Sequence, residues 1–266
     1  MNNLVLVNKI FGIIGVWFLL VLAGVLFCPQ AEAQTPRPLL QGGVDHVESM
    51  PAVEPALRAG ATYDAAVVDK LTPGNDWFRI PSFLAGYWKT TNSTRFYVFY
   101  SSDSSEDRQV VQEYSAYEEN FGHQVDKEGS IWHYTDVPYK TSIDKPKVKE
   151  IQIVSGFESM YMDPSKIILR HRSKRIQVDK VTQKITKSFQ AECIQTYTQV
   201  DAQHFRMDAS IQSYDQNGKP MNLTKRYSFA TRVDPFKPVT FFSGKNIKQL
   251  FVEYLTYRGL AYLIPN

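Results

Sequence analysis

Cysteine is scarce in this chain of 266 residues, where it occurs only at Cys28 and Cys193. Cys28 lies in an N-terminal segment that we expect to be removed, so Cys193 is left without a partner for an intramolecular disulfide. The rest of the chain must therefore fold around an apolar core. The 16 Phe, 15 Tyr and 4 Trp of the chain supply ample material for such a core.

An excess of charge of one sign is also lacking, since 30 basic residues face 27 acidic ones and the formal net charge is +3. So small an excess does not favour binding to nucleic acid or to a membrane surface. We expect no nucleic-acid partner, and contact with a membrane only through the N-terminal segment if that segment is not cleaved.

Motifs that carry catalysis or hold a metal are missing as well. The five histidines form no HxH or HExxH spacing, and the chain has neither a G-x-S-x-G elbow nor a glycine-rich phosphate loop. His123 and His133 flank Asp126 and Glu128, but without a metal-ligand spacing this segment is typical of a solvated loop. We therefore expect no catalytic residues, no metal, no cofactor and no enzymatic activity.

The N-terminus is the one long apolar stretch. Lys9 precedes an uncharged run at residues 10–27, and the sequence AEA follows at 31–33. This order predicts a secretory signal peptide at residues 1–33. The run of about 18 residues is close to the lower limit for spanning a bilayer, so an uncleaved N-terminal anchor is the alternative. Both place the rest of the chain outside the cytoplasm, whether periplasmic, cell-envelope or secreted.

Residues 34–75 are rich in proline and alanine, which predicts a linker or a loosely attached arm. Residues 61–71 within it have the composition of a short helix. The sequence thus divides into the signal segment, this arm and a domain at residues 76–266.

The domain has the alternation of β-strands. In TRFYVFY, residues 94–100, β-branched and aromatic side chains would point to opposite faces in turn. Similar runs follow at 130–134, 148–154, 166–178, 185–198, 205–214 and 223–233. Asn217-Gly218 joins the last two as a hairpin, because Asn-Gly readily adopts positive φ angles. Sequential strands with short polar connections predict an antiparallel meander, and closure into a barrel would remove its exposed edges.

A helix is expected near the C-terminus. Ile247, Leu250, Phe251, Tyr254 and Leu255 recur at the spacing of one helical face. This amphipathic helix should pack on the outside of the sheet. A brief final strand is expected at residues 260–265.

Gly86-x-Trp88 at the start of the first strand, the meander and the C-terminal helix together resemble the lipocalin-like, or calycin, β-barrels. The resemblance implies an all-β fold, an antiparallel meander closed into a lipocalin-like barrel with one C-terminal helix. It also implies that Trp88 packs across the barrel floor beneath an arginine, either Arg226 or Arg232. An ordinary buried core aromatic is the alternative for Trp88.

The densest charge cluster is RHRSKR at residues 170–175. On a strand, Arg170, Arg172 and Lys174 would share one face, while Arg175 would lie on the other. One interpretation is an anion-binding patch; the other is an exposed strand that resists edge pairing.

These features predict an exported, non-enzymatic protein that holds a small hydrophobic or amphipathic ligand in its barrel. The alternative is a structural or interaction module of the cell envelope that acts through its outer surface. The expected partners are accordingly a small hydrophobic molecule or an envelope component, and the residues that would contact a ligand are unknown at this level.

Overall fold

The computed structural model describes residues 45–69 and 76–265, all within one compact unit that spans Leu39–Asn266. The expected signal segment at 1–33 lies outside the described residues. Within this part the chain is all-β apart from short helices, and every strand pairing is antiparallel.

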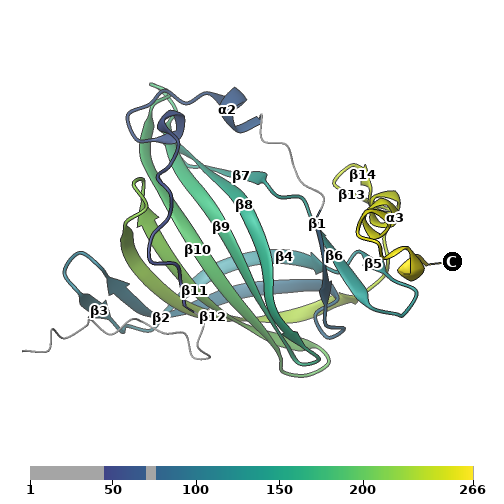
Figure 1. Ribbon diagram of the computed structural model, residues 1–266. Coiled ribbons are helices and arrows are strands. Elements are labelled where there is room, and N and C mark those ends of the chain that lie inside the picture. The colour runs from purple at the N-terminus through teal and green to yellow at the C-terminus, as the bar shows by residue number, and fades with distance from the viewer. Residues whose placement is uncertain (1–44, 70–75, 266) are drawn as a thin grey trace, which may run out of the picture. The chain divides into compact units, whose positions relative to one another are not determined.

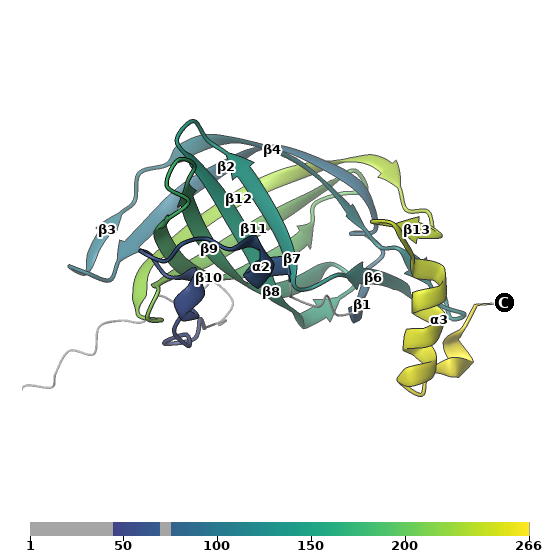
Figure 2. The ribbon, with the colours of Figure 1, turned by 90° about the horizontal axis from the view of Figure 1, so that it is seen from above.

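The largest element is a nine-stranded sheet that curls strongly on itself (Figures 1 and 2). Its strands run in the order β7-β8-β9-β10-β11-β12-β2, and β3 and β4 pair with successive parts of the far edge of β2. The strands are β2 (Gly86–Tyr100), β3 (Ser105–Asp107), β4 (Val111–Phe121), β7 (Tyr139–Asp144), β8 (Val148–Asp163), β9 (Lys166–Asp179), β10 (Ile185–Gln199), β11 (His204–Asp215) and β12 (Pro220–Pro235). The predicted meander is confirmed from β8 to β12, whereas the run expected at 130–134 belongs to a separate sheet.

A smaller sheet lies beside the C-terminal helix. It consists of β1 (Asp76–Ile80), β6 (Ile131–Thr135) and β5 (Gln124–Val125), in that order. The predicted amphipathic helix is confirmed as α3 (Ile247–Tyr257), and the Asn246 side chain accepts a hydrogen bond from the backbone of Gln249 at its start. The strands β13 (Phe241–Phe242) and β14 (Lys245–Asn246) form a hairpin just before it.

Helix α3 packs on this smaller sheet, and not on the outside of the main sheet as expected. Phe251 and the other buried residues of the helix share a cluster with Trp77, Trp132 and Tyr134. The predicted final strand is wrong: the chain instead turns through η3 (Ala261–Leu263), which returns Leu263 to the same cluster.

The predicted closure of the barrel is not seen in the described strands. On one side β4 pairs only with β2, and on the other side β7 pairs only with β8. Both edge strands bury few side chains: only Phe121 of β4 is buried, and all six residues of β7 are exposed. The sheet is therefore curled but open between β4 and β7.

The arm is better attached than its composition suggests. Residues 45–69, with η2 (Pro55–Leu57) and α2 (Ala65–Asp69), follow the outer face of the main sheet (Figure 1). Val53 and Leu57 are buried there against isoleucines of β8 and β9. At the predicted Asn217-Gly218 hairpin, a Cβ on Gly218 would lie 1.7 Å from the Met50 carbonyl oxygen, so only glycine lets the arm approach this closely.

Candidate functional site

The residues predicted for a barrel floor do surround Trp88, with one exception. Trp88 is buried, its indole N–H donates to the Leu84 carbonyl at 2.7 Å, and the Arg232 guanidinium carbon lies 4.4 Å from its ring centroid. Gly86 has φ +132°, and a Cβ there would lie 2.7 Å from the Asp234 carbonyl oxygen. Arg226 is elsewhere, with its guanidinium 3.6 Å from Glu113.

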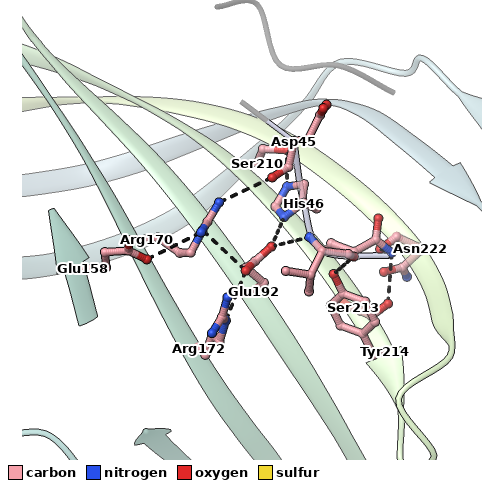
Figure 3. A network of polar contacts seen from close by, with 12 residues as sticks. Asp45, His46, Glu158, Arg170, Arg172, Glu192, Ser210, Ser213, Tyr214 and Asn222 are labelled. Carbon is pink, nitrogen blue, oxygen red and sulfur yellow. Dashed lines mark hydrogen bonds and ion pairs between the residues drawn. The ribbon is translucent and has the colours of Figure 1, made fainter. Parts of the chain in front are cut away.

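The predicted basic patch is divided between two faces of the sheet. On the outer face Arg170 and Arg172 both pair with the carboxylate of Glu192 (Figure 3). Lys174 on the same face pairs with Glu54 of the arm. Three cations there already have carboxylate partners, so they are not a free anion-binding patch. Arg175 points to the opposite, concave face, as strand alternation requires.

The buried carboxylate of Glu192 joins the arm to the sheet. Its oxygens accept hydrogen bonds from the His46 ring and the Val47 N–H, both at 3.0 Å, and from Arg172 at 3.2 Å (Figure 3). Burial would by itself raise the pKa of Glu192, but the hydrogen bonds from His46 and Val47 and the charge of Arg170 lower it to about 2. The network is structural, because every atom of the carboxylate is already engaged.

A cavity of about 400 Å³ lies on the concave side, in the place where β4 and β7 fail to meet. It is bounded by residues of both edge strands, of β8 to β10, of β6, and of β13 with the turn that follows it. The lining residues are Glu119, Asn120, Phe121, His133, Tyr134, Thr135, Asp136, Tyr139, Phe157, His171, Gln195, Tyr197, Phe242 and Ser243. Aromatic rings thus form much of the wall, with polar groups set among them.

Two histidines on the wall are held in the neutral form. The Gly122 N–H donates to Nδ1 of His133 at 3.2 Å, which leaves Nε2 to carry the proton of the neutral ring. Burial, assisted by the neighbouring His123, lowers the pKa of His133 well below its ordinary value. Burial and then the charge of Arg175 lower the pKa of His171 to about 4. Near neutral pH the cavity therefore presents imidazoles without positive charge.

Two carboxylates, Glu119 and Asp136, lie on the cavity wall. Asp136 pairs with Lys245 at 2.7 Å, whereas Glu119 has no hydrogen bond or ion pair with any described residue. The residue is partly buried and lines the cavity. Burial raises the pKa of Glu119 to about 7. After burial, the charge of Glu119 is the next cause that raises the pKa of both Tyr139 and Tyr197, so these phenols lie close to it.

The prediction of a solvated loop at residues 123–133 holds only for the exposed turn at Lys127, Glu128 and Gly129, and is wrong for the rest of the segment. His123 is fully buried, its Nδ1 accepts the Tyr134 N–H at 3.0 Å, and its ring centroid lies 4.6 Å from that of His133. Asp126 is buried too and accepts the indole N–H of Trp132 at 2.9 Å. The segment is the β5–β6 hairpin, and the alternation IWHYT at 131–135 was the signal that one histidine points inward. Within the described residues no group of three or more His, Cys, Asp or Glu is placed to hold a metal.

Comparisons with known proteins assign no family to this chain. No family model matches the chain, and no curated protein matches it. Among solved structures, Ail, the attachment invasion locus protein of Yersinia pestis, aligns with 55% of this chain and 99% of its own, at 7% identity and a TM-score of 0.27. A likeness at that level carries no argument about this chain.

The described helices are too short or too polar to cross a membrane.

Proposed function

We propose that this protein is an exported, non-enzymatic binding protein that holds a small amphipathic molecule in the cavity between β4 and β7. The observation that carries the proposal is the cavity itself, about 400 Å³ in volume and walled by Phe121, Phe157 and Phe242 together with a few polar groups. Ligand sites are commonly concave, 300–1,000 Å³ in size, and largely apolar with a small number of polar groups that orient the ligand.

The open seam supports this proposal. A closed barrel of this size could be filled by its own side chains. Here the sheet stays open between β4 and β7, and the cavity lies at that opening, which gives a ligand a way in. Export is the part of the proposal that rests on the N-terminal sequence. The assignment to a lipocalin-like type of sheet rests on Gly86, Trp88 and Arg232.

No chemical step is proposed for the cavity. The thiol of Cys193, a core residue, has its pKa raised by burial to about 12, so it stays protonated near neutral pH and is not the activated nucleophile that covalent catalysis requires.

Native mass spectrometry of the protein, isolated gently from its own host, tests the proposal. The expected result is a reproducible adduct of a few hundred daltons that is lost on denaturation. A bare mass from folded protein would overturn it and favour the alternative, a structural or interaction module of the cell envelope that acts through its outer surface.

A further inference from the structure

Three acids that are fully or partly buried, Glu192, Asp126 and Glu119, differ sharply in how many hydrogen bonds and ion pairs they make. Glu192 has two arginines, a histidine and a backbone N–H around it, and Asp126 accepts hydrogen bonds from Arg79, Trp132 and the backbone of Ser130. Glu119 has no such partner among the described residues. An ionised carboxylate that is removed from water without a partner is costly, so an unpaired one that faces a cavity calls for an explanation.

The surroundings of Glu119 suit a positive charge. Tyr139 of β7 and Tyr197 of β10 are close enough for its charge to raise their pKa values, and Phe121 lies two residues along the same strand, also on the cavity wall. The faces of aromatic rings attract cations, and more strongly where water is excluded. A carboxylate together with such rings is an arrangement that recognises an ammonium group.

The described residues do not supply that cation. Burial is the only cause of the raised pKa of Glu119, with no contribution from a neighbouring positive charge. Lys245 pairs with the wall residue Asp136 at 2.7 Å, and Arg226 pairs with Glu113 at 3.6 Å. The rings of His133 and His171 are neutral. Arg175, on the concave face, is close enough to lower the pKa of His171, but its charge is not among the causes that shift the pKa of Glu119.

We propose that the cavity binds an amphipathic amine, whose ammonium group pairs with the carboxylate of Glu119 and faces Tyr139 and Tyr197, while its apolar part lies against Phe157 and Phe242. This inference rests on the proposed function and names the chemical class of its ligand. Binding stabilises the ionised form of Glu119, so uptake of an ammonium ion below pH 7 releases a proton.

Calorimetric titration with three probes of equal chain length, n-octylamine, 1-octanol and octanoate, separates the charge from the chain. At pH 8, where the amine is protonated and Glu119 ionised, octylammonium is expected to bind about tenfold more tightly than octanol, and octanoate more weakly than either. In the Glu119→Gln variant the preference for octylammonium over octanol should disappear, while the affinity for octanol stays the same.

The matched control is Glu118→Gln. Glu118 neighbours Glu119 in sequence but points to the other face of β4, where it is exposed and pairs with Lys89 at 3.7 Å. This variant makes the same change in net charge and should bind all three probes as the unaltered protein does.

The outcomes distinguish the two proposals. If octanol binds as tightly as octylammonium, or if Glu119→Gln leaves the preference intact, the cavity is a ligand site but the assignment to amines is overturned. If none of the three probes binds, both the assignment and the proposed function fail. Proton release measured in buffers of different ionisation enthalpy at pH 6.5 should accompany binding in the unaltered protein and vanish in Glu119→Gln.

Discussion

The guanidinium of Arg232 lies over the indole of Trp88 and at the same time donates hydrogen bonds to the carbonyl oxygens of Ala85 at 2.6 Å and Phe83 at 2.7 Å. These carbonyls belong to the turn that leads from β1 into β2. One side chain from the end of β12 thereby holds both the ring and the backbone at the start of the main sheet.

Replacement of Arg232 by alanine is expected to destabilise the protein by about 3 kcal/mol, because it leaves buried carbonyl groups without donors and removes the cation from the ring. Urea unfolding followed by tryptophan fluorescence would measure this. Arg206→Ala is the control, since Arg206 pairs with Asp208 at the surface and should cost about 1 kcal/mol or less. An equal decrease in the free energy of unfolding for the two variants would contradict a larger structural role for Arg232 than for Arg206.

Glu192→Gln should loosen the arm while the sheet stays folded. Amide hydrogen exchange at Met50 and Val53, whose N–H groups bond to the carbonyls of Gly218 and Gln216, is expected to accelerate at least several-fold. Glu158→Gln removes an exposed carboxylate that also faces Arg170 and should leave these amides protected. Unchanged protection in Glu192→Gln would show that the apolar contacts of Val53 and Leu57 are sufficient to hold the arm.

Acid should release the same contact. The pKa of Glu192 in the folded protein is about 2, below its ordinary value of 4.5, so its contribution to stability is complete above pH 4.5 and is lost as the pH falls from 4.5 towards 2. Exchange at Met50 and Val53, corrected for the intrinsic pH dependence, should rise across that window and do so much less in Glu192→Gln.

The ionisation of Glu119 should change the pH dependence of stability in the opposite direction. Its pKa in the folded protein is raised from 4.5 to about 7, so the folded state binds more protons than the unfolded state between these values. The free energy of unfolding should therefore fall as the pH rises from 4.5 to 7. Glu119→Gln removes this penalty and should stabilise the ligand-free protein by on the order of 2–3 kcal/mol at pH 8, with little effect at pH 4. A stabilisation independent of pH would contradict the burial of an unpaired carboxyl.

The thiol of Cys193 should be inert in the folded protein. It is buried, and burial raises its pKa to about 12, so almost no thiolate is present at pH 8. Iodoacetamide is expected to leave Cys193 unlabelled in native protein and to label it fully in denaturant, as peptide mass mapping would show. Rapid labelling of the native protein would mean that the core opens readily around β10.

The strands from β8 to β12, their hairpin at Asn217-Gly218 and the helix α3 could be predicted from the sequence, because each is marked by a local pattern. Alternating apolar residues indicate strands, Asn-Gly indicates a tight turn, and the spacing of apolar residues from Ile247 to Leu255 indicates one face of a helix. The edge strands β4 and β7 were missed because they lack this pattern. An edge strand buries fewer side chains, so its sequence is more polar.

The candidate site lay beyond that kind of reasoning. Adjacent glutamates such as Glu118 and Glu119 look alike in sequence, and which of them enters a cavity depends on strands that are distant along the chain. The same holds for His46 and Glu192, which are 146 residues apart and meet only because the arm crosses the outer face of the sheet. By itself the sequence determined the all-β character, the meander and the terminal helix, since these follow from local periodicity. Only the tertiary structure decided that the sheet stays open between β4 and β7 and that an unpaired carboxylate faces the space left there, because burial and pairing are set by contacts between residues far apart in the chain.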